Sequence, residues 1–512
     1  MNHPSRSGQQ WPVRLKEVTS SLVSLAILRR ALFCGVESFA IGATLIPALA
    51  RPPQPAADAV AGRVDEYVSQ VMQARHSAGL SLAVVKQGRI IKAGGYGFAN
   101  VEHRVPASGT TVYRIASVTK TFTAAAIMLL AQGGKVRLDD RISRYFPDFP
   151  ASWHYVTVRH LLTHTSGIKD YIDEVRRSPF EDTTPDEIIR SLAAEPLNFQ
   201  PGEKWKYSNT GYLILGQLIQ RVSGKAWDDY LDERIFAPLG MAATRRHIHW
   251  DPIPGLASRY DWRDNSLRNA LFLNSTVWDN ADGGLCSTVL DLAKWDASLY
   301  TESVLKRESL EQLWTPTRLN GGTTVRYGLG WDIGESFRGH RLIEHSGGSP
   351  GTSAYLGRFL DDQLTVIVLA NTGQANAWLV GRSVAGLYDP NLLPPHMMRQ
   401  QAVGDPTLRQ QLLKFLAVVA GNQRNPSLMT AGMQQALDED DEGRILTNQR
   451  LKAMKSFIYV DCEGAKGRPE TRHGTAVTRT CFFKMETGVE NRYYIFWLTA
   501  EGLVADYTSY AE

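Results

Sequence analysis

The segment that most limits what this chain can fold into is residues 114–122, where Ser117 and Lys120 stand three positions apart. The apolar residues that follow recur at helical spacing as far as a Gly-Gly pair, which predicts a helix that begins near the serine. Residues three apart share one face of a helix, so the hydroxyl and the amine lie within hydrogen-bond reach. A lysine desolvated in a pocket can accept the proton of a serine, which suits covalent acyl transfer. An isolated match also describes a helix N-cap followed by a surface lysine, so the rest of the chain must decide.

The length and charge of the chain narrow the classes of function. Its 512 residues are too many for one ordinary domain and predict two domains behind a leader. Lys and Arg number 56 and Asp and Glu number 52, and the resulting charge of +4 is spread along the chain without a basic stripe. We therefore expect no nucleic acid partner. The four cysteines lack zinc-binding spacing, so the sequence indicates no metal site, and we expect no cofactor.

An apolar run over residues 31–50 follows two arginines and ends in Ala-Leu-Ala. A basic flank, an apolar core and an Ala-x-Ala ending are the parts of a secretory signal, so we expect a leader over residues 1–50 and a linker over 51–60. The protein would then be exported to the periplasm or the extracellular space. Glu37 inside the apolar run leaves two alternatives open, an uncleaved membrane anchor through residues 31–50 and a chain that stays in the cytosol.

Residues 61–393 are expected to form one domain in which strands flank a helical middle part. A helix is predicted over 61–75, and two β-rich runs over 79–97 predict a hairpin. The chain is mostly helical from about 136 to 319, and strand-like runs return over 327–371. We therefore predict an α/β fold in which the first and last segments share one sheet with flanking helices, around an all-helical insert.

Two further polar groups can carry chemistry. Tyr207 and Asn209 lie two apart in a loop bracketed by Pro-Gly and Asn-Thr-Gly, so in an extended loop they project to the same side. A phenol there can carry a proton, and an amide can hold a substrate carbonyl or side-chain amide. The alternative is a tyrosine packed under a loop and an asparagine that makes a turn. His345-Ser346-Gly347 ends a β run, and by itself this triplet is a turn.

Two histidines, His160 and His164, stand four apart in an expected helix. Histidines at this spacing can bind zinc, but no glutamate of the H-E-x-x-H kind lies between them. Packing and hydrogen bonding are therefore favoured over a metal site.

Taken together and in this order, Ser117-x-x-Lys120, Tyr207-x-Asn209 and His345-Ser346-Gly347 resemble the three motifs of the serine β-lactamase and penicillin-binding protein superfamily. The Tyr-x-Asn version is similar to the branch of class C β-lactamases, D-aminopeptidases and family VIII esterases. Flanking blocks over residues 159–167, 201–203 and 237–241 also look like this branch. The resemblance covers roughly residues 60–390 and implies a β-lactamase/transpeptidase-like antiparallel sheet with flanking helices.

The resemblance also implies roles for the motif residues. Ser117 is the nucleophile, Lys120 assists its deprotonation, and Tyr207 shuttles the proton to the leaving group. Substrate binding falls to Asn209, His345, Ser346, Gly347 and Gly348, with the backbone N–H groups of Ser117 and Gly348 as the oxyanion hole. The implied activity is hydrolysis of an ester, amide or peptide bond in a small-molecule or peptide substrate, through an acyl-enzyme at Ser117.

The third motif departs from that of efficient β-lactamases, which carry a lysine where this chain has His345. A lysine is a fixed cation that holds a substrate carboxylate, whereas a histidine is largely neutral at pH 7. We therefore expect an esterase or a D-amino-acid-type peptidase rather than an efficient β-lactamase. The alternative, from a different class of function, is a non-catalytic or very slow sensor or scaffold protein of the same fold.

The composition shifts after Pro394-Pro395, which predicts a second domain over residues 394–512. Three short helices followed by four strands are expected there, an α+β arrangement whose order resembles nuclear-transport-factor-2-like folds. Cys462 and Cys481 fall on adjacent expected strands, and they either form a disulfide in an exported protein or stay as buried thiols.

Overall fold

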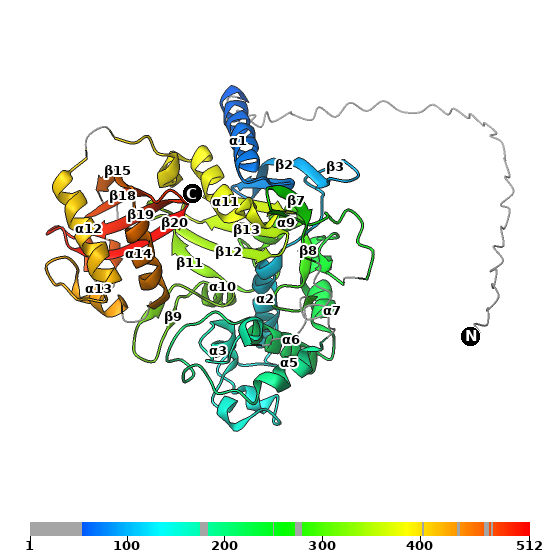
Figure 1. Cartoon of the computed structure of the whole chain (residues 1–512). Helices are drawn as coiled ribbons and strands as arrows, with labels where there is room; N and C mark the ends of the chain where they lie inside the picture. The colour runs from blue at the N-terminus through cyan, green and yellow to red at the C-terminus, as the bar shows by residue number, and fades with distance from the viewer. Residues whose placement is uncertain are drawn as a thin grey trace, which may run out of the picture. The chain divides into compact units, whose positions relative to one another are not determined.

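A seven-stranded antiparallel sheet organises the larger part of the computed structural model (Figure 1). The strands lie in the order β11-β12-β13-β14-β1-β2-β3. Their bounds are Gly79–Lys86 (β1), Arg89–Asn100 (β2), Val105–Pro106 (β3), Asp332–Glu335 (β11), Arg341–Ser349 (β12), Thr352–Phe359 (β13) and Leu364–Ala370 (β14). β1 pairs with β14 from Leu80 opposite Ala370 to Lys86 opposite Leu364. The first and last segments therefore share one sheet, which confirms the sequence prediction.

The structure describes residues 54–512 except 175–182, 249, 272–278, 402–403, 438–440, 465–469 and 473–474. The leader predicted over 1–50 lies outside the described residues. Gln54–Glu512 forms one compact unit. Helix α1 spans Gln54–Ala74, so most of the segment predicted as a linker over 51–60 is helical. Its alanines are strong helix formers, and Pro55 suits a first helical turn. None of the described helices is both long and apolar enough to cross a membrane.

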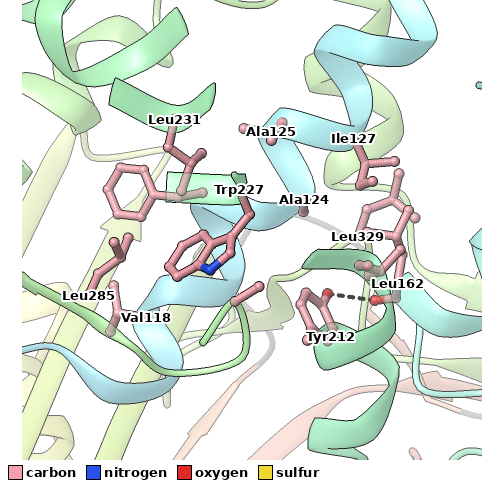
Figure 2. Close-up of a cluster of buried hydrophobic side chains, with 14 of the residues drawn as sticks. Val118, Ala124, Ala125, Ile127, Leu162, Tyr212, Trp227, Leu231, Leu285 and Leu329 are labelled. Atoms are coloured by element: carbon pink, nitrogen blue, oxygen red, sulfur yellow. Dashed lines mark hydrogen bonds between the residues drawn. The ribbon is translucent and has the colours of Figure 1, made fainter. Parts of the chain in front are cut away.

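Helix α2 (Thr119–Gln132) runs through the interior directly after the 3-10 turn η1 (Ala116–Val118). Every α2 residue from Thr119 to Leu130 is buried. A helix that is covered on all sides needs apolar or small residues around its whole circumference, and α2 supplies them. In Figure 2, Ala124, Ala125 and Ile127 of α2 lie among Leu162, Trp227 and Leu231 of the surrounding helices. The helix that carries the Ser-x-x-Lys motif is thus the centre of the main hydrophobic core.

The insert between the sheet segments is not all-helical, which corrects the prediction. Its helices are α3 (Val158–Leu162), α4 (Tyr171–Glu174), α5 (Pro185–Leu192), α6 (Asn209–Ser223), α7 (Trp227–Leu231), α8 (Ala237–Leu239), α9 (Val289–Ser298) and α10 (Arg307–Leu313). Its short strands are β4 (Tyr113–Arg114), β5 (Arg245–Arg246), β6 (Tyr260–Arg263), β7 (Ser266–Asn269), β8 (Leu285–Ser287), β9 (Thr317–Arg318) and β10 (Thr324–Val325). The β6–β7 hairpin turns at Asp264 and Asn265, whose φ angles of 50° and 55° suit a tight two-residue turn.

The other face of the large sheet is covered by α1 and by α11 (Ala377–Tyr388). Side chains of both helices pack on alternate residues of the central strands, among them Leu82, Val366 and Val368. The sheet is therefore buried on both faces, and its strands β1 and β14 are buried almost throughout.

The C-terminal region contains three helices followed by an antiparallel sheet, as the sequence predicts. The helices are α12 (Pro406–Ala420), α13 (Ala431–Ala436) and α14 (Asp441–Ala453). The sheet has the order β15-β18-β19-β20, with bounds Ser456–Gly464, Arg479–Glu486, Asn491–Leu498 and Val504–Ala511. A separate hairpin joins β16 (Glu470–Arg472) to β17 (Thr475–Val477). Cys462 and Cys481 face each other across β15 and β18 and form a disulfide, so they are not two buried thiols.

The C-terminal sheet packs against the rest of the compact unit. Phe337, which follows β11, and Leu379 of α11 share a hydrophobic cluster with Phe482, Ile495 and other residues of the C-terminal sheet. This contact brings an edge of the small sheet close to the end of β11.

Candidate active site

The serine of the first motif is presented by a tight turn. The preceding residue, Ala116, has a φ of +43°, a conformation that an L-residue adopts only when its surroundings hold it there. The turn is held because the Ile115 N–H donates to the carbonyl of Leu285 and the Val118 N–H donates to the carbonyl of Ile115. Ser117 is partly exposed although the residues on both sides of it are buried. The hydroxyl is thus offered to solvent from an otherwise closed segment.

Lys120 lies one helical turn further on and is completely buried. Its Nζ donates to Ser117 Oγ at 3.2 Å, to Asn209 Oδ1 at 2.8 Å and to the backbone carbonyl of Asp282 at 2.6 Å. All three acceptors are uncharged. Burial lowers the pKa of Lys120 to about 8, although Asp282 and Asp170 act in the opposite direction. The amine is therefore partly neutral near pH 7 and can accept the Ser117 proton.

Two buried carboxyl groups flank the lysine, and the sequence analysis did not identify either of them. Asp170 accepts hydrogen bonds from the backbone N–H and the side-chain amide of Asn209. Asp282 accepts the Tyr171 hydroxyl at 2.8 Å. Burial raises the pKa of both carboxyls, that of Asp282 to about 6. Together they form an anionic shell behind the lysine that limits how far the pKa of Lys120 falls.

Tyr207 reaches the same centre from the loop before α6. Lys120 Nζ lies 4.8 Å from the centroid of its ring. Burial raises the pKa of Tyr207 well above its usual value, and a hydrogen bond with Ser117 acts in the opposite direction. The phenol is therefore protonated at neutral pH and lies where it can exchange a proton with Ser117 Oγ. The structure thus brings together Ser117, Lys120 and Tyr207, the three residues predicted to be catalytic.

Asn209 occupies the first turn of α6 with both ends of its amide engaged. Its oxygen accepts from Lys120 and its nitrogen donates to Asp170 at 2.9 Å. The side chain is 8% exposed. It therefore links the lysine to the carboxylate behind it, a connection that the predicted role in substrate binding does not include.

The third motif lies on β12 beside the serine turn. Nδ1 of His345 is 2.7 Å from the carbonyl of Ser346, and Nε2 is 3.0 Å from the hydroxyl of Tyr327. A neutral imidazole satisfies both contacts when Nδ1–H donates to the carbonyl and Nε2 accepts from the tyrosine. Burial and the nearby charge of Lys120 lower the pKa of His345 to about 3. His345 is therefore neutral, buried and already paired, and it offers no cation to a substrate.

The three residues after His345 differ in their surroundings. Ser346 is exposed. Gly347 packs on the serine turn so closely that a Cβ there would lie 2.2 Å from the carbonyl oxygen of Ile115. Gly348 is exposed and open space surrounds its Cβ position. Only glycine fits at position 347, which fixes the distance between β12 and the Ser117 turn.

The two histidines that are four apart do not act together. His160 completes a capping box with Thr157 at the start of α3. Nδ1 of His164 accepts from the Ser208 N–H at 3.1 Å, and its ring lies 4.3 Å from that of Tyr207. Within the described residues no group of three or more His, Cys, Asp or Glu side chains is arranged to hold a metal ion. His164 instead packs its ring against the ring of Tyr207.

Three comparisons place this geometry among known proteins. A family model described as "Beta-lactamase" matches residues 64–381. Penicillin-binding protein 4* of Bacillus subtilis is 32% identical over 312 residues, which are 58% of this chain and 69% of that protein. The region that the family model matches, residues 64–381, contains all three motifs and ends before the C-terminal sheet.

Two solved structures are similar in fold. The octameric penicillin-binding protein homologue from Pyrococcus abyssi superposes with a TM-score of 0.58 and 26% identity, over 86% of this chain and 97% of that one. The D-amino acid amidase from Ochrobactrum anthropi, solved with D-phenylalanine, gives a TM-score of 0.55 and 28% identity, over 64% of this chain and 98% of that one.

Proposed function

Since the chain belongs to the beta-lactamase family, we propose that it is a serine hydrolase that cleaves an ester, amide or peptide bond through an acyl-enzyme at Ser117. The observation that carries the proposal is the environment of Lys120. A fully buried amine that contacts the serine hydroxyl and only uncharged acceptors is suited to act as a general base near neutral pH.

In the proposed reaction, Lys120 and Tyr207 transfer the protons. Lys120 Nζ takes the Ser117 proton while Oγ forms a bond to the substrate carbonyl carbon, and the carbonyl oxygen becomes an oxyanion. The backbone N–H groups of Ser117 and Gly348 are the proposed donors to that oxyanion, each worth about 3–4 kcal/mol in the transition state. The scissile bond breaks as Tyr207 passes a proton to the leaving oxygen or nitrogen and is reprotonated from Lys120. Water then hydrolyses the acyl-enzyme by the reverse proton movements.

The substrate class follows from His345. A neutral imidazole that is paired with Tyr327 and Ser346 cannot replace a lysine that binds a carboxylate. We therefore favour esters and D-aminoacyl amides or peptides over penicillins, and the similarity to a structure described as a D-amino acid amidase supports this choice. The Cys462–Cys481 disulfide supports export, because such bonds persist in oxidising compartments.

A short set of reactions tests the proposal. The purified protein is mixed with a nitrophenyl ester, a D-aminoacyl nitroanilide and a penicillin, beside a Ser117→Ala control, and both turnover and intact-protein mass are followed. Turnover of the ester or the anilide that is lost in Ser117→Ala supports the proposal. The alternative, a slow sensor or scaffold of the same fold, predicts a stable acyl adduct on Ser117 without turnover. Turnover that persists in Ser117→Ala would show that Ser117 is not the nucleophile.

A further inference from the structure

A cavity of about 610 Å³ lies between the C-terminal sheet and the end of the large sheet. Its size falls within the range of roughly 300–1,000 Å³ that is typical of ligand sites. The lining comes from Lys204 and Trp205, from residues 323–326 and 334–337, from Trp378, Arg382, Ile495 and Trp497, and from residues 506–510. None of these residues belongs to the catalytic set described above.

The order of the lining residues shows that the cavity follows strand edges. Side chains alternate between the two faces of a strand, so a cavity on one face touches every second residue. Here five consecutive residues of β20, Asp506–Tyr510, line the cavity, as do four consecutive residues, Gly334–Phe337, that include the end of β11. The cavity also touches Ile495 and Trp497, which are two apart on β19, so it lies over one face of the C-terminal sheet and extends around the edge at β20.

Both strands are the outermost members of their sheets. β11 begins the order of the large sheet and β20 ends the order of the C-terminal sheet. The two edges approach each other where the ring of Phe337 lies 4.8 Å from that of Tyr510, and Figure 1 shows β20 ending beside β11. An outer strand edge offers main-chain donors and acceptors to an added strand.

The ladder of β20 identifies one such donor. The Glu512 N–H donates to the Asn491 carbonyl, so this pair is hydrogen-bonded. Hydrogen-bonded and non-hydrogen-bonded pairs alternate in an antiparallel ladder. Counting back along the register, the pair of Ser509 with Tyr494 is non-hydrogen-bonded. The Ser509 N–H therefore points away from β19, toward the cavity edge.

The cavity adjoins the catalytic centre through one side chain. Trp205, which is 38% exposed, lies on the same loop as Tyr207. Its ring is 6.0 Å from that of Tyr327, the partner of His345, and 6.2 Å from that of His164. Trp205 therefore both lines the cavity and contacts the aromatic residues around Tyr207.

The charges of the lining favour an uncharged ligand. Arg382 forms an ion pair with Glu344 at 2.5 Å, and Arg326 lies 3.7 Å from Asp506, which also lines the cavity. Its remaining charged side chains are Lys204 and Glu335, one of each sign. Aromatic rings, hydroxyls and balanced charges suit an amphipathic chain and not a phosphate or a polyanion.

We propose that this cavity is a subsite for an extended peptide, which adds as a strand to the edge of β20 while its scissile bond lies at Ser117. The inference rests on the proposed serine hydrolase function and adds a substrate class to it. Strand addition supplies affinity through main-chain hydrogen bonds, and Trp205 and Trp497 provide walls for alternate side chains. The outward N–H of Tyr507 already donates to Asp506 Oδ1 at 2.8 Å, so the added strand would pair with the outward N–H and C=O of Ser509.

The first test changes the ligand and leaves the protein intact. The value of kcat/KM is measured for nitrophenyl acetate, for the nitrophenyl ester of an N-acetylated tetrapeptide, and for the same ester with N-methylated amides. We expect the tetrapeptide ester to be at least tenfold better than the acetate, and N-methylation to remove most of that gain. Equal values for the two peptide esters would overturn the inference.

The second test changes one backbone donor. Ser509→Pro removes the outward N–H, whereas Ser509→Ala keeps it and removes only the side-chain contact with Arg492. We expect Ser509→Pro to lower kcat/KM for the tetrapeptide ester about tenfold and to leave nitrophenyl acetate within twofold, with Ser509→Ala like the parent on both. If Ser509→Pro fails to fold, quenching of tryptophan fluorescence by the tetrapeptide amide in Ser117→Ala replaces it, and no quenching contradicts the inference. Absence of all ester turnover would contradict the proposed function instead.

Discussion

Two fully buried cations, Lys120 and Arg358, are held in opposite ways. Arg358 of β13 donates from Nε to Asp296 at 2.6 Å, and both side chains are completely buried. Its guanidinium also lies over the rings of Tyr300 and Trp314, at 4.6 and 4.9 Å. Lys120 has no carboxylate oxygen within ion-pair distance among the described residues, and it contacts uncharged acceptors instead.

The presence or absence of a carboxylate in direct contact decides whether each buried cation stays protonated. A carboxylate in direct contact keeps a buried cation charged, because the pair compensates part of the cost of desolvation. Asp282 and Asp170 act on Lys120 only from a distance, so desolvation dominates and the pKa of Lys120 falls to about 8. About one lysine in ten is then neutral at pH 7 and able to act as a base. A direct ion pair thus keeps Arg358 charged, whereas the absence of a carboxylate in direct contact allows Lys120 to lose its proton.

The largest expected effect comes from replacing the reactive cation with one that stays charged. In Lys120→Arg the guanidinium cannot lose its proton, so the proposed general base is lost while a buried cation remains. We expect kcat for a nitrophenyl ester to fall by about 10²–10⁴-fold. The matched control is Arg358→Lys, which exchanges the same two side chains at the buried ion pair with Asp296. Activity in Lys120→Arg close to that of the parent would mean that another group removes the Ser117 proton.

The next effect is on stability. Arg358→Met leaves Asp296 buried without its partner, which costs about 3–5 kcal/mol of unfolding free energy. The midpoint of chemical unfolding should fall accordingly, while kcat at a temperature where the variant is folded stays within a few-fold. A large loss of kcat in the folded variant would show that Arg358 contributes to activity as well as to stability.

The pH dependence of activity sharpens the comparison further. Because the neutral amine is the active form in the proposed mechanism, kcat/KM should rise with pH and level off above an apparent pKa of about 8. The anionic Asp282 favours the charged lysine, so Asp282→Asn should lower the pKa of Lys120 and shift this limb to lower pH. A pH–rate profile of both proteins on one ester measures the shift. A shift to higher pH would contradict the assignment of the limb to Lys120.

The sequence predicted the parts of the site that local spacing determines. Ser117 and Lys120 come together because they are three apart, across the junction of the 3-10 turn η1 and helix α2, and Tyr207 was found through its motif. Most strands of both sheets were also predictable, because their apolar runs end in clear turns. The strand-like run over 327–331 instead precedes the strand β11, and the two-residue strand β3 was missed. The β6–β7 hairpin was missed because its strands are short and polar.

The electrostatic shell could not be predicted, because it depends on contacts between distant segments. Asp170 and Asp282 are single acids in separate loops. Asp170 is bonded to Asn209 at the start of α6, and the loop of Asp282 accepts hydrogen bonds from Lys120 and Thr123 of α2. Asn209 was predicted to meet the substrate, whereas its amide joins Lys120 to Asp170. The cavity beside β20 was equally hidden, since it forms where two sheet edges meet.

The smallest expected effect concerns the neutral histidine. Tyr327→Phe removes the hydroxyl that lies 3.0 Å from His345 Nε2, which leaves a buried acceptor without its donor and costs roughly 1–3 kcal/mol of stability. Burial and Lys120 still keep the pKa of His345 low, so no new limb should appear between pH 5 and 7 in the pH–rate profile. We expect kcat to fall only a few-fold. Tyr145→Phe, which removes a phenol bonded to Asp140 away from the site, is the matched control. A new limb near pH 6 in the pH–rate profile of Tyr327→Phe would show that the tyrosine, and not burial, keeps His345 neutral. It would also show that His345 can carry a positive charge in this fold.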